Sequence, residues 1–314
     1  MITTFTANPS IDKTLRFEED IMLGGVNRAA EVVVQPGGKG INVALGLTRA
    51  GVAVRAVFPA NPSDPLLPLL PELDVVTAPA PAAVRTNVSV VTPSGTTKIN
   101  EPGAEFSRAE IEELERTLFE ASGDYVMLSG SLAPGFPTDE YVQLVHTLHE
   151  RGAWVGVDTS DEPLAAIAAN LPDAAPDFLK PNADELAELI GANGDELEAA
   201  ASKGDYAQLI AASRQLHEAG VANVLVSLGS AGAMLTNAEG TWFAPAPKVT
   251  PRSTVGAGDS SVAGFLQAFT RGASSAKCLA WAVAYGSAAV TLPGTSIPRL
   301  DAVTPDFSAV TRLA

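Results

Sequence analysis

Two glycines and an acidic residue in the stretch 253–261 are the strongest candidates for chemistry in this sequence. Gly256 and Gly258 let the backbone turn closely where an apolar helical pattern begins, which leaves N–H groups of the first turn, such as that of Ala257, without partners. A helix start of this kind binds anions. Asp259 follows, and a carboxylate beside a phosphate can accept a proton from an attacking hydroxyl. The alternative is that Asp259 only caps the helix.

A second glycine-rich turn, residues 37–40, opens another helical pattern that stops near Gly51. Lys39 and Asn42 lie about one helical turn apart and could face the same ligand. The spacing is neither that of a P-loop nor that of a dinucleotide-binding fingerprint. A simple tight turn is the alternative.

Polar residues also follow most of the strands that the sequence predicts. In a parallel α/β sheet the carboxyl ends of the strands lie at one edge, where ligands bind. Asn182 and Glu185, at i and i+3 of one helix, could hold Mg²⁺ through water, although a surface pair is the alternative. For Asp12 the alternative is an ordinary turn aspartate. The residues that follow strands are Asp12, Ser131, Asp158, Lys180, Asn182 and Ser227.

The composition narrows the classes of function. The 314 residues carry a formal net charge of −16, which disfavours binding to nucleic acid or to an anionic membrane. The chain has no run of about 20 apolar residues and no signal peptide, so we expect a cytoplasmic protein. The single cysteine, Cys278, lies in an apolar pattern and is expected to be buried. The three histidines fall at solvent-facing helical positions, which argues against a zinc or histidine-base mechanism.

Strand and helix patterns alternate regularly from residue 107 onward, which predicts a mostly parallel sheet covered on both faces. Ser107 and Glu110 form a capping-box pattern at the first of these helices. Two β segments, 13–36 and 84–102, break the rhythm and predict a small sheet that covers the main domain. Further expectations are a loose proline-rich connection at 59–82 with a short strand near 74–76, solvated helix or loop at 197–203, and helices at 138–151, 162–169, 205–219, 256–271 and 274–291.

Taken in order, these motifs resemble the PfkB/ribokinase family of carbohydrate kinases over nearly the whole chain. The most specific match is Ser-Thr-Val-Gly-Ala-Gly-Asp-Ser at 253–260, and Pro-Gly-Gly-Lys-Gly-Ile-Asn-Val-Ala at 36–44 is similar to the sugar-phosphate kinases. Shorter segments at 25–28, 85–88 and 99–103 look most like 1-phosphofructokinases, and tagatose-6-phosphate kinases and minor 6-phosphofructokinases share much of this. The resemblance implies a three-layer α/β fold, one kinase domain spanning 1–314, and a β-sheet lid.

The resemblance also implies a role for each motif residue. Asp259 would be the base and the backbone of Gly256, Ala257 and Gly258 the anion hole for the γ-phosphoryl group. ATP and a ketohexose phosphate, with fructose 1-phosphate as the leading candidate, would be the substrates, and many members pair across their lids as homodimers. The implied ligands are Asp12, Gly38, Asn42 and Ser131 for the sugar, Arg28, Lys39 and Arg85 for its phosphate, Lys180, Ser227, Gly229, Gly232, Thr254 and Ser287 for the nucleotide, and Asn182 and Glu185 for Mg²⁺.

One segment departs from the family pattern. Prolines in 59–81 replace a glycine- and aspartate-containing turn and the helix after it, which puts that helix and its sugar-side contacts in doubt. Three alternatives stay open: a kinase for tagatose 6-phosphate or fructose 6-phosphate, a non-catalytic sugar-phosphate sensor, and a ribose or nucleoside kinase. An intact Asp259 disfavours a sensor, and the basic residues on the sugar side disfavour an uncharged sugar.

Overall fold

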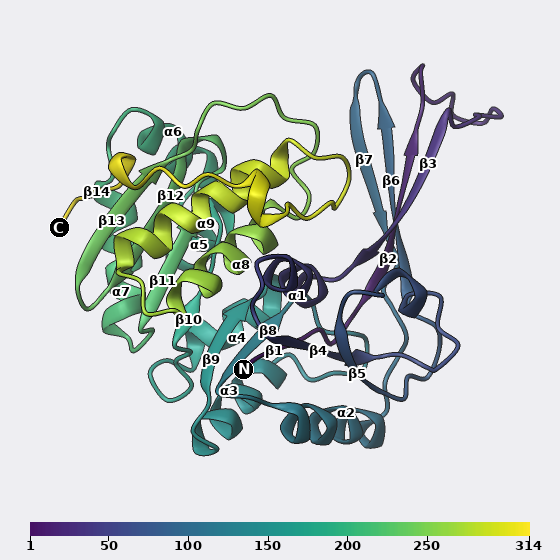
Figure 1. Ribbon diagram of the computed structural model, residues 1–314, viewed down its shortest axis with the longest axis horizontal. Coiled ribbons are helices and arrows are strands. Elements are labelled where there is room, and N and C mark those ends of the chain that lie inside the picture. Colours follow the sequence, from purple (N-terminus) through teal and green to yellow (C-terminus); the bar gives the residue numbers. More distant parts are fainter.

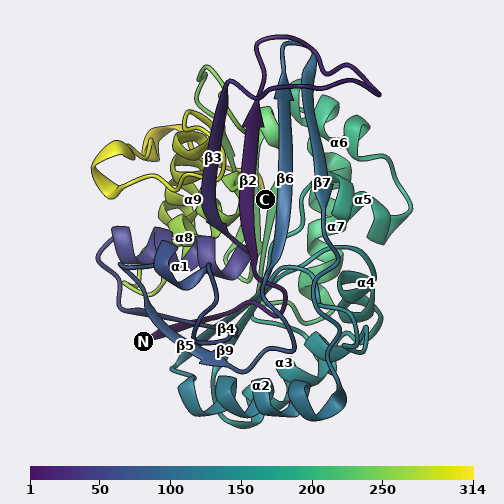
Figure 2. The same cartoon turned by 90° about the vertical axis from the view of Figure 1, so that its right-hand side faces the viewer.

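The computed structural model describes all residues from Met1 to Ala314. A large sheet carries helices on both faces, and a smaller sheet projects from one side of it (Figures 1 and 2). The main sheet has ten strands in the order β14-β13-β12-β11-β10-β9-β8-β1-β4-β5. Neighbours from β11 to β5 are parallel, and β12, β13 and β14 continue the sheet antiparallel. The predicted mostly parallel sheet with helices on both faces is confirmed.

The main-sheet strands are β1 (Ile2–Phe5), β4 (Val54–Pro59), β5 (Asp74–Ala78), β8 (Tyr125–Ser129), β9 (Trp154–Asp158), β10 (Phe178–Leu179), β11 (Asn223–Ser227), β12 (Gly232–Asn237), β13 (Gly240–Pro245) and β14 (Thr311–Arg312). The small-sheet strands are β2 (Ser10–Arg16), β3 (Glu31–Gly37), β6 (Arg85–Thr92) and β7 (Gly95–Asn100). The α-helices are α1 (Lys39–Arg49), α2 (Arg108–Ala121), α3 (Glu140–Glu150), α4 (Asp161–Ala169), α5 (Ala183–Ile190), α6 (Gly194–Ser202), α7 (Ala207–Glu218), α8 (Ala257–Phe269) and α9 (Ser275–Val290).

Two hydrophobic cores lie on the two faces of the main sheet. Helices α1, α8 and α9 cover one face and bury residues such as Ile41, Phe265 and Leu279. Helices α2 to α7 cover the other face and bury residues such as Leu118 and Leu144. Strands buried on both faces read as nearly continuous apolar runs, which is why the sequence locates them. No helix is both long enough and apolar enough to cross a membrane, and Cys278 is buried as expected.

The small sheet has the order β3-β2-β6-β7 and stands on the edge of the molecule where α1 begins (Figure 2). Both predicted β segments belong to it, but its first strand starts at Ser10 rather than at residue 13. Asp12 therefore lies inside β2, opposite Gln35 of β3, and not in a turn at a strand end. The reason is that the chain needs only residues 6–9 to leave the main sheet before pairing again.

Other local predictions fared unevenly. The capping box of Ser107 and Glu110 is confirmed at α2, and the connection 59–82 contains only a short 3₁₀ turn and β5. The stretch 197–203 is not solvated throughout, because it belongs largely to α6, which buries Leu197 and Ala201. The sequence gives no hint of β14, whose two residues pair with β13.

Glu140, the first residue of α3, is buried, and neither of its carboxyl oxygens accepts a hydrogen bond. Burial, together with the neighbouring Glu115, raises its pKa to about 8, against the opposing charge of Arg108. Between pH 4.5, the ordinary pKa of a glutamate, and pH 8, the Glu140 carboxyl group is therefore protonated in the folded chain and ionised in the unfolded chain. The stabilisation from this proton is complete below pH 4.5 and is lost as the pH rises through 8.

We expect Glu140→Gln to leave the free energy of unfolding nearly unchanged at pH 5 and to raise it by a few kcal/mol at pH 9. A pKa raised from 4.5 to about 8 corresponds to at most about 5 kcal/mol, at about 1.4 kcal/mol per pKa unit. Urea denaturation at pH 5, 7 and 9 measures this difference. The exposed Glu188 on α5 provides the control, because Glu188→Gln should show no such trend. A stability difference for Glu140→Gln that does not grow with pH would contradict the assignment.

Candidate active site

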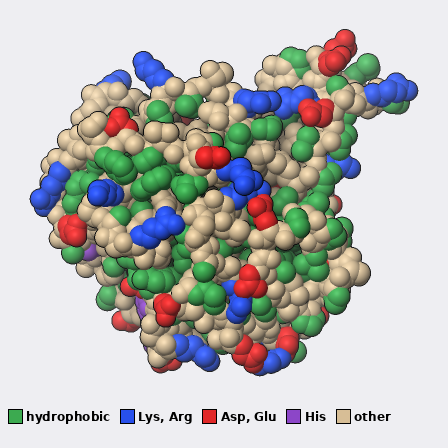
Figure 3. Space-filling model, viewed as in Figure 1, with side chains coloured by type: hydrophobic (Ala, Val, Ile, Leu, Met, Phe, Trp, Pro, Cys, Tyr) green, Lys and Arg blue, Asp and Glu red, His purple; other side chains and the backbone are tan.

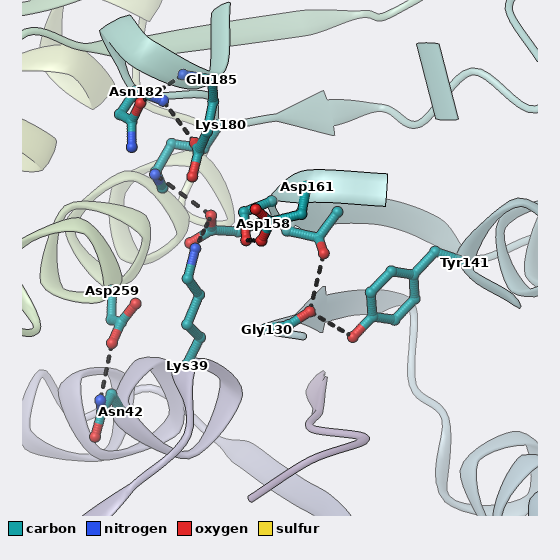
Figure 4. Close-up of polar contacts among 12 residues, drawn as sticks. Lys39, Asn42, Gly130, Tyr141, Asp158, Asp161, Lys180, Asn182, Glu185 and Asp259 are labelled. Atoms are coloured by element: carbon teal, nitrogen blue, oxygen red, sulfur yellow. Dashed lines mark hydrogen bonds and ion pairs between the residues drawn. The ribbon is translucent and has the colours of Figure 1, made fainter. Parts of the chain in front are cut away.

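The helix starts of α1 and α8 meet the carboxyl ends of β9 and β10 at one edge of the main sheet (Figure 4). The small sheet rises beside this edge. Basic and acidic side chains lie next to one another near the junction of the small sheet and the main body (Figure 3). The candidate site is built from these elements.

The first turn of α8 offers unpaired N–H donors. Gly256 is its N-cap, in the left-handed conformation with φ of 78°, and no side chain caps the helix. The N–H groups of Gly258 and Asp259 have no partner within the protein, and that of Ala257 has only a 3.5 Å contact with the Thr254 carbonyl. Such donors at the positive end of a helix dipole suit a phosphoryl oxygen.

Asp259 is buried, with 7% of its surface exposed. Its Oδ2 accepts a hydrogen bond of 2.8 Å from Asn42 Nδ2 on α1, so its carboxylate faces the other glycine-rich helix start and does not cap α8. Burial, followed by the charge of Asp158, raises the pKa of Asp259 to about 6, against Lys39 and Asn42. A carboxylate with a pKa just below neutral is ionised at pH 7 and well matched to accept a proton.

Asp158, at the end of β9, holds two lysines together (Figure 4). Its Oδ1 lies 2.9 Å from Lys39 Nζ and 3.4 Å from Lys180 Nζ, and its side chain is fully buried. Burial works against the charge, but the two ammonium groups still hold the pKa of Asp158 below its usual range. The sequence marks Asp158 as a polar residue after a strand but assigns it no role, because nothing in the sequence shows that both lysines converge on it.

Lys180 is also close to the first turn of α8. Its side chain is 4% exposed, and its Nζ lies 3.5 Å from the position that a Cβ on Gly258 would occupy. Lys39 is one-third exposed and lies near Asp259 and Glu185 as well as Asp158. Both ammonium groups therefore lie close to the place where the N–H donors of α8 would bind a phosphate.

The predicted sugar ligands come together on the small-sheet side. Asp12 Oδ1 accepts hydrogen bonds from Ser10 Oγ at 2.9 Å and Asn87 Nδ2 at 3.3 Å, and Arg85 Nη2 lies 3.3 Å from Ser131 Oγ. Gly38 caps α1 with φ of 106°, a conformation that favours glycine. Asn87 was not predicted as a ligand, although it lies two residues after Arg85 and therefore on the same face of β6.

Arg28 is not brought to the site of its own chain. It is exposed and lies in the segment 17–30, at the end of the small sheet farthest from the main sheet (Figure 1). The seven-residue strand β3 that separates it from the glycine-rich turn is roughly 20 Å long.

Asn182 and Glu185 form a capping box at α5. Asn182 Oδ1 accepts from Glu185 N, and Glu185 Oε2 accepts from Asn182 N, each at 2.8 Å. The pair is therefore more than a surface pair, and it leaves Glu185 Oε1 available. Burial raises the pKa of Glu185 against the charges of Lys180 and Lys39. No group of three or more acidic, histidine or cysteine side chains could hold a metal alone. One carboxylate oxygen suits Mg²⁺ that is otherwise bound by water and phosphates.

The predicted nucleotide residues lie at the end of β11, in the turn that follows it, in the loop before α8 and on α9. Ser227 pairs with Asn182 in an isolated parallel bridge, and Gly229 and Gly232 both have positive φ. Thr254 is exposed in the loop before α8, and Ser287 lies on α9, next to Gly286, which packs on Ala257 and Ser261 of α8. Glu198 of α6 lies in no sequence motif, and its carboxylate lies against Gly229.

Comparisons with known proteins show the family to which the chain belongs. Residues 6–302 match the model of the pfkB family of carbohydrate kinases. The chain is 34% identical over 308 residues to a 1-phosphofructokinase of Haloferax volcanii, covering 96% of this chain and 95% of that protein. It is also similar to the crystal structure of phosphofructokinase-2 from Escherichia coli in complex with substrates and products, with a TM-score of 0.84, 31% identity and 96% coverage of both chains.

The structure of ribokinase from Thermotoga maritima shares the fold with a TM-score of 0.72 at 22% identity, covering 96% of this chain and 97% of that one. The expected ribokinase-like fold is therefore confirmed. The chain belongs to the pfkB family of carbohydrate kinases and is an ATP-dependent phosphotransferase.

Proposed function

We propose that this kinase phosphorylates D-fructose 1-phosphate to fructose 1,6-bisphosphate. The observation that carries the proposal is the buried Asp259 carboxylate, which adjoins unpaired N–H groups of α8 and faces the sugar-side residue Asn42. The choice of sugar is supported by the 1-phosphofructokinase of Haloferax volcanii, which is similar over nearly the full chain.

The residues of this chain divide the work of the transfer. Asp259 accepts the proton of the sugar's C6 hydroxyl, whose oxygen forms a bond to the γ-phosphorus while the bond from that phosphorus to the β-phosphate oxygen breaks and ADP leaves. The N–H groups of Ala257 and Gly258 stabilise the charge on the transferred phosphoryl oxygens. Lys180 and Lys39 add positive charge beside them.

Glu185, oriented by Asn182, would hold Mg²⁺ through its unpaired oxygen or through water. When bound, Mg²⁺ neutralises charge on the nucleotide phosphates. Ser227, Gly229, Gly232, Thr254 and Ser287 would surround the nucleotide, and the small sheet would act as a lid that keeps water from the reaction.

Release of ADP across a panel of sugars, with and without Mg²⁺, tests the proposed function. We expect fructose 1-phosphate to give the highest kcat/KM, above fructose 6-phosphate, tagatose 6-phosphate and the uncharged sugars fructose and ribose. A higher kcat/KM for either 6-phosphate would overturn the sugar assignment. No ADP release from any sugar would favour the non-catalytic sensor.

Lys39→Ala separates two roles for this lysine. If Lys39 binds the sugar's phosphate, as the family pattern implies, the KM for the sugar phosphate should rise at least about tenfold, and the charge that Lys39 adds beside the transferred phosphoryl group predicts that kcat falls as well. Its position on Asp158 and near Asp259 predicts in addition a rise in the KM for ATP. Steady-state kinetics with each substrate varied in turn measures both. An unchanged KM for the sugar phosphate would remove Lys39 from that site.

A homodimer through the small sheet would explain why apolar side chains are exposed at the end of that sheet farthest from the main sheet. Large apolar side chains are exposed there, with Leu23 at 90%, Val26 at 77% and Met22 at 65%, and an exposed apolar patch marks an interaction surface. In such a dimer Arg28 could approach the partner's site. We expect Leu23→Asp to shift the protein to monomer in sedimentation, whereas Thr97→Ala on β7 should not. A monomeric wild-type protein at micromolar concentration would contradict the dimer.

A further inference from the structure

Gln35 of β3 reaches from the small sheet to a segment near the end of the chain. Its Nε2 donates to Ser296 Oγ at 2.8 Å, and its Oε1 accepts from Thr295 N at 3.0 Å. Thr295 Oγ1 lies 3.4 Å from the same oxygen. One carboxamide thus uses both of its ends on two adjacent residues, and none of the roles assigned above involves it.

The contact is closely fitted. Gly294, just before these partners, has φ of 60°, and a Cβ at that position would clash with Gln35 Oε1. Thr295 is buried, with 6% of its surface exposed. The segment 292–299 has no regular helix or strand, so side-chain contacts help to fix its position beside the local turn in which Ser296 N donates to Pro293 O.

The same segment backs the first turn of α8. The atoms nearest to a Cβ placed on Gly256 are Thr295 Cα and Thr295 O, both at 3.8 Å, followed by Ile297 Cδ1 at 3.9 Å. Arg49 of α1 holds the far end of the segment by donating to Ile297 O at 2.6 Å. A shift of Thr295 would therefore displace the N-cap of α8 and the N–H groups of the proposed anion hole that follows it.

The strand position of Gln35 also adjoins a proposed sugar ligand. In the pairing of β2 with β3, Gln35 lies directly opposite Asp12, and two residues later β3 enters the Gly37–Gly38 turn that leads to Lys39. Gln35 is thus one residue that connects the strands carrying the proposed sugar site to the segment behind the proposed phosphoryl site.

We propose that Gln35 is a positioning residue that couples the two substrate sites of this kinase. A sugar phosphate that fixes β2 and β3 would, through Gln35, also fix Thr295 behind Gly256, and a nucleotide that fixes the α8 turn would in turn favour the same position of β3. Coupling of this kind is reciprocal and typically changes affinity by about 5- to 150-fold. The inference rests on the proposed function for the identity of the two sites.

Isothermal titration with the magnesium complex of a non-hydrolysable ATP analogue measures the coupling. The Kd of the analogue is measured without and with a saturating concentration of the sugar phosphate that the ADP-release panel identifies. We expect about tenfold tighter binding with the sugar phosphate in the wild type and less than about twofold in Gln35→Ala. Gln35→Glu should keep the coupling, because its carboxylate still accepts from Thr295 N and Ser296 Oγ can donate to it. Thr97→Ala, on the outer strand of the small sheet, should behave as the wild type.

A ratio in Gln35→Ala equal to that of the wild type would overturn the proposal. Equal loss in Gln35→Ala and Gln35→Glu would also overturn it, because the hydrogen bonds would then not be the cause. Amide hydrogen exchange of the ligand-free proteins tests the same link without any substrate. We expect residues 253–260 to exchange at least about fivefold faster in Gln35→Ala, and unchanged exchange there would sink the idea. Failure of every sugar in the panel would overturn the proposed function instead, and the exchange result would still decide the role of Gln35.

Discussion

Asp259→Asn is expected to lower kcat by about 10²–10⁴-fold, the usual contribution of a general base, or more, while the Kd for ATP stays within a few-fold. The substituted amide has nearly the shape of the carboxylate, and its oxygen can still accept the hydrogen bond from Asn42 that Asp259 accepts at 2.8 Å. What the amide cannot do is take the proton of the attacking hydroxyl. Single-turnover phosphoryl transfer and calorimetric titration with ATP measure the two quantities separately.

The wild-type enzyme should show a matching pH dependence. Because the pKa of Asp259 is raised to about 6, kcat/KM should fall as the pH drops below 6 and the base becomes protonated. Glu110→Gln serves as the control, since Glu110 is a helix-capping carboxylate far from the site in sequence and structure, and it should leave kcat unchanged. Near-normal turnover of Asp259→Asn would show that this carboxylate is not the base.

Asp158→Asn is expected to lower the free energy of unfolding by about 3 kcal/mol, near the lower end of the cost of breaking a buried ion pair. Asp158 is fully buried, and Lys180 is 4% exposed, so the substitution leaves a buried ammonium without a counter-charge. Lys39 is 32% exposed, and solvent reduces its share of the loss. We also expect kcat to fall, because Lys180 lies over Gly258 and its position depends on Asp158. Urea denaturation and steady-state kinetics measure the two effects.

The same substitution at an exposed ion pair provides the control. Asp74 contacts Arg55 at 2.9 Å, with about half of the Asp74 side chain exposed. Asp74→Asn should change the free energy of unfolding by less than about 1 kcal/mol, as is usual for surface pairs. An equal effect of the two substitutions would contradict a special role for Asp158.

The parts of the site that depend on local backbone shape could be predicted from the sequence. The glycine-rich starts of α1 and α8 can be recognised from short sequence segments, because glycine is favoured where a turn takes positive φ, as at Gly38 and Gly256. The alternation of apolar strands and amphipathic helices likewise specifies a parallel sheet. The family resemblance then added roles that these patterns alone leave open.

The contacts that tune the site could not be predicted, because they join residues far apart in the chain. Asn42 and Asp259 are separated by 217 positions, and Lys39 and Asp158 by 119. The pairs form only because α1 packs against α8 and the end of β9 reaches the start of α1. Asn182 and Glu185 are close in the sequence, but their spacing is ambiguous: the same i, i+3 spacing fits a metal-binding pair and a capping box. Gln35 belongs to no motif, and its proposed positioning role can be recognised only from its hydrogen bonds to Thr295 and Ser296.

The most direct test of the proposed reaction is phosphorus NMR of the products formed from ATP and fructose 1-phosphate. We predict that fructose 1,6-bisphosphate and ADP appear in equal amounts and that neither forms at an appreciable rate with Asp259→Asn. Formation of ADP with inorganic phosphate and no new sugar ester, or phosphorylation of a different sugar in preference to fructose 1-phosphate, would contradict the account.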